Sequence, residues 1–149
     1  DPQWQTNEVK SSAFDNAATF LAVDDAFSFS LNKDEDSATL VWIIAAEHYL
    51  YRHAFAISMD IPNADGGVEQ HSLTAETTFS QGIKTNDDYF GPVEIYYYQA
   101  TAQLPIERIT HLALLSDSLN SPPQLSIQYQ GCAEAGLCYP VQTRKMNLP

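Results

Sequence analysis

The sequence has few basic residues, few cysteines and no long apolar run. Of its 149 residues only 7 are Lys or Arg, against 19 Asp or Glu, so the formal net charge is −12 at pH 7. A charge of this sign repels phosphate backbones and anionic lipid headgroups, which disfavours nucleic-acid and membrane-surface binding. Hydrophobic residues make up 44% of the chain, but polar ones interrupt them throughout. No stretch approaches the roughly 20 apolar residues that span a bilayer.

Sequence signatures of several enzyme classes are also missing. The chain has no glycine-rich phosphate loop, no Gly-x-Ser-x-Gly elbow and no His-Glu-x-x-His motif. Its 4 histidines are scattered, and 2 cysteines are too few for a disulfide scaffold or a four-ligand zinc site. These enzyme classes are therefore disfavoured, and we expect no metal site.

The length predicts a single domain over residues 1–149, because one domain takes roughly 150 residues. We expect the polar start, 1–12, to be loosely held and 147–149 to begin a linker. The first residue is Asp1 rather than Met, and no leader pattern precedes it, so we expect a mature or excised chain.

Alternation of apolar and polar residues is the clearest periodic signal. It is strict over 27–31 and over 125–130, which predicts half-buried strands there. Other apolar or alternating runs predict strands at 39–44, 49–57, 93–98, 109–115 and 141–146. No 12-residue window shows a helical period. Many short strands with turn residues between them predict an all-β fold, an antiparallel β-sandwich of immunoglobulin-like type. A jelly roll or a partly open barrel is the alternative.

The two cysteines flank a short loop, Gly131-Cys-Ala-Glu-Ala-Gly-Leu-Cys-Tyr-Pro140. Strands predicted before and after it make a hairpin, in which Cys132 and Cys138 reach disulfide distance. Closing a loop of roughly seven residues stabilises the fold by only about 2 to 2.5 kcal/mol, so the bond is either a simple staple or an exchangeable disulfide. Glu134 is the one charge inside the loop, and a nearby carboxylate raises the pKa of a thiol. We therefore expect a dithiol that exchanges with a suitable partner rather than a free-running oxidant.

This loop closely resembles the G-C-A-[DE]-A-G-[FL]-C-Y-P segment of the family of N-terminal periplasmic domains of the thiol:disulfide interchange protein DsbD. The resemblance spans roughly residues 14–148. The further segments that agree, in order, are Phe14-Asp15, Ala26–Phe29, Tyr49–Arg52, Asp87–Gly91 and Glu94–Tyr96.

The resemblance implies an immunoglobulin-like sandwich that works as a thiol:disulfide oxidoreductase without a cofactor. By position, Cys138 is similar to the thiol that forms mixed disulfides with partners, and Cys132 to the resolving thiol. The family receives electrons from a thioredoxin-like C-terminal domain of the same protein and passes them to periplasmic disulfide isomerases and a cytochrome c maturation thioredoxin. It implies a periplasmic domain of a bacterial inner-membrane protein, and transient encounters favour a monomer.

The segment from Asp87 to Gly91 resembles the family's cap loop, which shields the disulfide until a partner displaces it. The family's Phe-Tyr order is Tyr89-Phe90 here, so either ring is a candidate to cover the sulfurs. Asp87 and Asp88 are candidates to tune the protonation of the thiols; a solvated turn is the alternative. The remaining residues expected around the site are Tyr49, Tyr51, Glu134, Tyr139 and Pro140.

Two other functions are compatible with the same loop. An immunoglobulin-like binding or adhesion module would carry a purely structural disulfide, and a protease-inhibitor-like domain would present the loop to a protease. The reduction potential separates exchange from a staple, because structural disulfides have potentials below about −300 mV.

Overall fold

The computed structural model describes residues 20–116 and 122–147. The expected loose start at 1–12, the Phe14-Asp15 match and the final linker residues 148–149 lie outside these ranges. Asn147, expected to begin the linker, is the last residue of strand β13.

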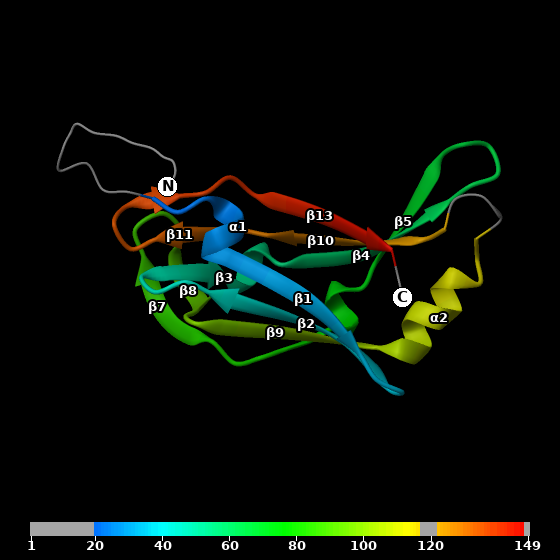
Figure 1. Ribbon diagram of the computed structural model, residues 1–149, viewed down its shortest axis with the longest axis horizontal. Coiled ribbons are helices and arrows are strands. Elements are labelled where there is room, and N and C mark those ends of the chain that lie inside the picture. The colour runs from blue at the N-terminus through cyan, green and yellow to red at the C-terminus, as the bar shows by residue number, and fades with distance from the viewer. Residues whose placement is uncertain (1–19, 117–121, 148–149) are drawn as a thin grey trace, which may run out of the picture.

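The described chain is almost entirely antiparallel sheet, as the alternation predicts (Figure 1). The strands are β1 (Phe27–Lys33), β2 (Ser37–Ile44), β3 (His48–Tyr51), β4 (Ala56–Pro62), β5 (Val68–Ser72), β6 (Thr78–Phe79), β7 (Ile83–Asp87), β8 (Gly91–Tyr96), β9 (Gln99–Pro105), β10 (Gln124–Tyr129), β11 (Gly131–Ala133), β12 (Leu137–Cys138) and β13 (Gln142–Asn147). The helical segments are α1 (Val23–Ala26), η2 (Arg52–Ala54), η3 (Thr74–Glu76) and α2 (Ile106–Ala113). Three sheets form, in the orders β1-β2-β9-β6, β13-β10-β4-β5 and β12-β11-β3-β8-β7.

The two four-stranded sheets enclose an aromatic core. Trp42 of β2 and Tyr129 of β10 are fully buried, and their ring centroids lie 5.8 Å apart. Phe29 of β1 stacks on Trp42 at 5.7 Å, and Phe55, the residue before β4, contacts Trp42 at 4.7 Å. Such aromatic pairs contribute about 0.5–1.5 kcal/mol each beyond the area they bury. These contacts join the sheets, and the expected immunoglobulin-like sandwich is confirmed.

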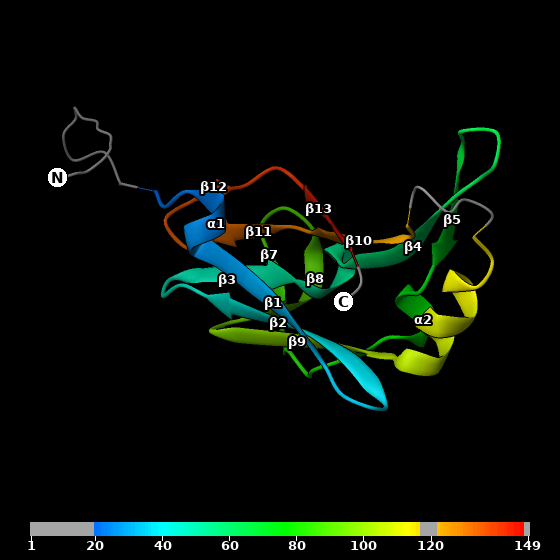
Figure 2. The same ribbon diagram turned by 45° about the vertical axis from the view of Figure 1, so that its right-hand side comes forward.

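The five-stranded sheet carries the cysteines and lies at the end of the molecule opposite α2 (Figures 1 and 2). Its strand β11 directly continues β10, so the sandwich positions the cysteine hairpin. Gly131 stands at this junction, where a Cβ atom would lie 2.4 Å from the Tyr49 carbonyl oxygen and 2.5 Å from Phe27 Cζ. Only glycine permits this close approach of β11 to β3.

Two sequence predictions differ from the structure. The predicted strand at 109–115 lies mostly in helix α2, which buries Ile109 and Leu112 against the core. The β-branched Ile109 and Thr110 favour a strand, but the three-residue spacing of Ile109 and Leu112 puts these two apolar side chains on one face of a two-turn helix. The predicted strand at 49–57 is interrupted by η2, which separates β3 from β4 and places them in different sheets.

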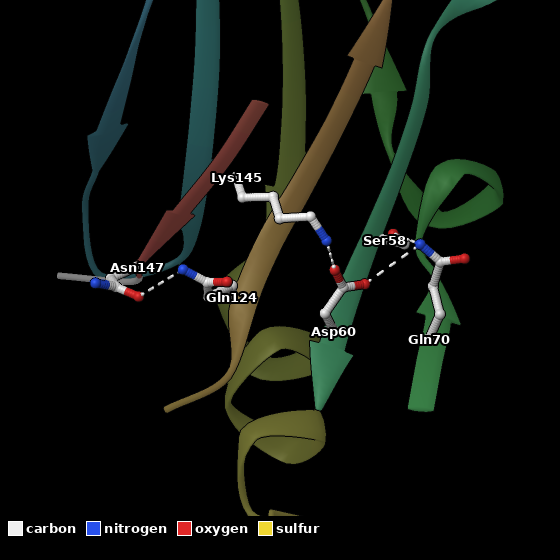
Figure 3. Close-up of polar contacts among 6 residues, drawn as sticks. All are labelled: Ser58, Asp60, Gln70, Gln124, Lys145 and Asn147. Atoms are coloured by element: carbon white, nitrogen blue, oxygen red, sulfur yellow. Dashed lines mark hydrogen bonds and ion pairs between the residues drawn. The ribbon is translucent and has the colours of Figure 1, made fainter. Parts of the chain in front are cut away.

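The β13-β10-β4-β5 sheet is tied together by a buried carboxylate, Asp60 (Figure 3). Lys145 of β13 donates to Asp60 Oδ2 at 2.5 Å, and Gln70 of β5 donates to Oδ1 at 3.3 Å. At the end of the sheet Gln124 donates to Asn147 at 3.2 Å. A buried carboxylate needs such partners. Because its two partners come from β13 and β5, Asp60 of β4 links both edge strands of the sheet.

Candidate functional site

The two cysteines stand directly opposite each other in the β11–β12 hairpin. Cys132 pairs with Cys138 in the antiparallel register, their Cα atoms are 4.0 Å apart, and a disulfide joins them. Gly136 closes the turn at φ 113°, a left-handed conformation that favours glycine, and its N–H donates to the Ala133 carbonyl at 3.0 Å. The expected bond between the cysteines is therefore confirmed.

The two cysteines differ in their exposure. Cys132 is only 1% exposed and packs with Tyr51 and Ile95. Cys138 lies on the short outer strand and is half-buried. A thiolate approaching from solvent therefore meets Cys138 first.

Tyr51 connects the buried cysteine to the loop between β7 and β8. Its hydroxyl oxygen lies 3.4 Å from Cys132 Sγ, and its O–H donates to Asp87 Oδ1 at 2.9 Å. Burial, followed by hydrogen bonding to Tyr49 and Asp87, raises the pKa of Tyr51 well above its ordinary value. The hydroxyl therefore stays protonated and lies between a carboxylate and a sulfur.

Tyr49 lies directly across from Cys132 on the neighbouring strand. Its ring contacts those of Tyr51 at 5.5 Å and Tyr97 at 5.9 Å. Burial is the largest cause of a raised pKa of Tyr49. Tyr49 and Tyr51 therefore both lie beside Cys132.

Asp87 fixes the loop that precedes Gly91. Its Oδ2 accepts hydrogen bonds from the backbone N–H groups of Tyr89 at 2.9 Å and Phe90 at 3.1 Å, while Oδ1 accepts from Tyr51. Gly91 ends the turn at φ 75°, where glycine is favoured. One carboxylate thus holds both the loop backbone and the tyrosine beside Cys132.

The two aromatic residues of this loop, Tyr89 and Phe90, differ in the contacts of their rings. The Phe90 ring contacts Tyr51 at 5.0 Å and His53 at 4.6 Å, both edge to face, although half of its surface is exposed. Tyr89 is 62% exposed. The ring that packs on the neighbour of Cys132 is therefore that of Phe90.

Glu134, in the turn of the cysteine hairpin, accepts a short hydrogen bond from the Tyr97 hydroxyl. This hydrogen bond, with a smaller contribution from burial, raises the pKa of Tyr97 to about 12. A pocket of about 200 Å³ beside the hairpin has three carboxylates in its lining, those of Asp87, Asp88 and Glu134. The negative charge expected near the thiols is therefore present on this side of the site.

Tyr139 follows the cysteine hairpin and connects it to the core. It is buried, and its hydroxyl donates to the Leu21 carbonyl at 2.7 Å and lies 3.5 Å from His48 Nε2. Its backbone N–H donates to the Gly131 carbonyl at 3.0 Å. Pro140 follows on the surface. Both residues flank the cysteines in the chain, but Tyr139 faces the core.

Three residues at the site were not predicted from the sequence: His53, Ile95 and Tyr97. Ile95 pairs with Tyr51 across β3 and β8, and this register brings β8 beside the cysteines. Periodicity reports which residues share a face but not which strands are neighbours, so it gives no signal for these three.

The described residues contain neither a metal-binding cluster nor a membrane-spanning helix. Within 20–116 and 122–147 no group of three His, Cys, Asp or Glu side chains is placed to hold a metal ion. None of the helices in these ranges has the length and apolar character needed to cross a membrane.

Relatives of known identity match most of the chain. The family model described as "Thiol:disulfide interchange protein DsbD, N-terminal" matches residues 17–149. The thiol:disulfide interchange protein DsbD of Yersinia pestis is 35% identical over 129 residues, which cover 87% of this chain and 18% of that protein. DsbD of Pseudoalteromonas atlantica is 35% identical over 145 residues, or 97% of this chain and 21% of that protein. The chain thus spans about a fifth of the length of these relatives.

Solved structures agree. The DsbD N-terminal domain of Neisseria meningitidis in its reduced form shares the fold, with a TM-score of 0.61, 24% identity, and coverage of 86% of this chain and 88% of that one. The complex between the DsbD N-terminal and PilB N-terminal domains of the same organism matches with a TM-score of 0.59, 26% identity, and coverage of 87% and 88%. The chain, with its paired cysteines on an immunoglobulin-like sandwich, belongs to the family of DsbD N-terminal domains.

Proposed function

We propose that the chain is a thiol:disulfide exchange module of the protein-disulfide reductase type, which relays two electrons between proteins through Cys132 and Cys138. The observation that carries this proposal is the pairing of an accessible cysteine with a buried one whose sulfur lies 3.4 Å from a protonated tyrosine hydroxyl. A purely structural disulfide needs neither a difference in exposure between its two cysteines nor the Tyr51 hydroxyl beside one of them.

The exchange begins when a donor thiolate attacks Cys138 Sγ. A mixed disulfide forms between donor and Cys138, the Cys132–Cys138 bond breaks, and Cys132 Sγ leaves with the electron pair as a thiolate. A second donor thiolate then attacks the donor sulfur of the mixed disulfide and releases Cys138. The donor ends as a disulfide, and both cysteines of this chain end reduced and take up protons from solvent. Reduction of an acceptor disulfide is the same sequence in reverse.

Tyr51 stabilises the leaving sulfur in this scheme. When Cys132 becomes a thiolate, the Tyr51 O–H can turn from Asp87 Oδ1 toward Sγ and donate a charge-assisted hydrogen bond. A hydrogen bond to a charged group contributes about 1.5–3 kcal/mol. Asp87 remains beside the hydroxyl and tunes how readily it turns.

The loop from Asp87 to Gly91 acts as a cap that a partner displaces. Its support is the contact of Phe90 with Tyr51 and the anchoring of the loop on Asp87. An attacking thiolate must approach along the axis of the breaking bond, so a loop beside the sulfurs determines which molecules reach them.

The electron donor in this proposal is the thioredoxin-like C-terminal domain of the same full-length protein. The acceptors are periplasmic disulfide isomerases and a cytochrome c maturation thioredoxin, and the chain works as a monomeric periplasmic domain of a bacterial inner-membrane protein. The curated relatives are several times longer than this chain. In Neisseria meningitidis a DsbD N-terminal domain forms a complex with the PilB N-terminal domain.

Trapping of the mixed disulfide tests the proposal. In Cys132→Ser the chain carries a free Cys138 thiol, which attacks the disulfide of the oxidised thioredoxin-like domain and releases one of that domain's sulfurs as a thiolate. The thiol that would close onto Cys138 and release the partner is absent, so the covalent adduct should accumulate on a non-reducing gel. Cys138→Ser is the matched control and should form little adduct. A wild-type reduction potential below about −300 mV in a glutathione titration would instead identify the bond as structural.

A further inference from the structure

A second pocket lies beside the β7–β8 hairpin, next to the pocket with the three carboxylates. Its volume is about 370 Å³. It is formed by Arg52 and His53 of η2, Lys84 and Thr85 of β7, and Val93 and Glu94 of β8. Figure 1 shows β7 and β8 side by side at the cysteine end of the molecule.

The pocket concentrates positive charge in a strongly acidic chain. Two of the 7 Lys and Arg residues, Arg52 and Lys84, lie in it. Elsewhere Arg108, Arg144 and Lys145 each form an ion pair with a carboxylate. In the described part of the chain neither pocket cation has such a partner.

The contacts inside the pocket leave these cations available. The Arg52 guanidinium lies 3.8 Å over the Phe79 ring, and this contact leaves its charge unneutralised. Lys84 is exposed. The one carboxylate in the lining, Glu94, stands opposite Lys84 in the β7–β8 register. It forms no ion pair with Lys84, and its Oε2 accepts a hydrogen bond from the Gly82 N–H at 2.7 Å, so the pocket keeps an excess of positive charge.

The pocket adjoins the proposed cap. His53 lines it, and the same ring contacts Phe90 at 4.6 Å and Tyr51 at 4.9 Å. Thr85 lines both this pocket and the carboxylate pocket. A pocket with two cations, the cationic pocket, thus adjoins a pocket with three carboxylates at the hairpin that bears the cap.

We propose that the cationic pocket binds a carboxylate side chain of the partner protein while the partner's cysteine engages Cys138. This inference rests on the proposed exchange function. Arg52 and Lys84 attract the carboxylate, and Val93 packs against its methylene groups. The three carboxylates of the adjoining pocket repel the same group, which favours the orientation of the partner that places its acid beside Arg52 and Lys84. Charges at the rim of an interface act mainly on the rate of association.

Charge reversal at Lys84 is the sharpest test. The oxidised chain is mixed with the reduced thioredoxin-like C-terminal domain of the full-length protein, and in parallel with dithiothreitol, and the second-order rate constants are measured. Lys84→Glu should lower the rate constant with the protein donor about tenfold and leave the dithiothreitol rate unchanged. Raising the ionic strength should shrink this difference, because salt screens exposed charges.

Arg108→Glu is the matched control, since it reverses the charge of a partly exposed cation far from the hairpin in the fold, and it should change neither rate. An unchanged rate of Lys84→Glu with the protein donor would overturn the docking site and leave the exchange function intact. An equal fall in the rate constant of Lys84→Glu with dithiothreitol would also overturn the docking site, because the substitution would then affect the disulfide itself. Loss of self-association with unchanged exchange would assign the pocket to a second copy of the chain. If the wild type fails to exchange with the donor domain, the proposed function fails and this inference with it.

Discussion

Replacement of Asp87 with alanine removes three hydrogen bonds at once. The carboxylate accepts the Tyr51 hydroxyl through one oxygen and the backbone N–H groups of Tyr89 and Phe90 through the other. Because Asp87 is only half-buried, water competes for its partners, and each bond is worth about 0.5 kcal/mol, the low end of the usual range. The sum of about 1.5 kcal/mol corresponds to a roughly tenfold rise in the fraction of molecules with a displaced cap.

The assay is the reduction of the disulfide by excess dithiothreitol, followed by quenching, alkylation of free thiols and mass spectrometry. We expect Asp87→Ala to react about tenfold faster than the wild type, in line with the larger open fraction. Loss of a nearby negative charge also favours an attacking thiolate, so Asp88→Ala is measured beside it. Asp88 is an exposed neighbouring carboxylate, and in the described structure no hydrogen bond to it is present. If both variants accelerate reduction equally, charge accounts for the effect and the anchoring role assigned to Asp87 is wrong.

Three further predictions concern tyrosines and the cap. Tyr51→Phe should slow reduction by dithiothreitol about tenfold in stopped-flow measurements, because a hydrogen bond worth about 1.5 kcal/mol to the leaving sulfur is lost; an unchanged rate would exclude that bond. Phe90→Ala should accelerate reduction more than Tyr89→Ala, since only the Phe90 ring packs on Tyr51, and the reverse order in the same assay would assign the cover to Tyr89. The pKa of Tyr97 is raised from 10.0 to about 12, so its contribution to stability is complete below pH 10 and is lost as the pH rises toward 12. Urea unfolding should show this loss in the wild type and a smaller one in Tyr97→Phe; identical profiles would contradict it.

The sequence was most informative where one local pattern determines the structure. Strict alternation placed Phe27 and Leu125 in strands, and the spacing of the cysteines between two strands predicted their bond. Helix α2 was missed because Ile106 and Ile109 are β-branched and two turns are too short to display a helical period. Propensity favoured a strand, but packing of the helix on the core decided the outcome.

The parts of the site that were not predicted all depend on strand order. Tyr97 reaches Glu134, which is 37 residues away in sequence, and His53 reaches Phe90 across another such gap. These contacts exist because β8 pairs with β3 and β3 with β11. Sheet order is set by the whole fold, so contacts between such distant residues can be identified only from the three-dimensional structure.

The backbone pairing around the cysteine hairpin has a consequence for the reduced state. Glu134 donates its N–H to the Glu47 carbonyl at 2.8 Å, and β11 pairs with β3 independently of the sulfur bond. Opening the disulfide therefore leaves the two thiols facing each other, at a high effective concentration. In the proposed exchange, attack of Cys132 on a mixed disulfide at Cys138 is therefore intramolecular and competes with the donor's second thiolate, and the hairpin needs no refolding between its oxidised and reduced states.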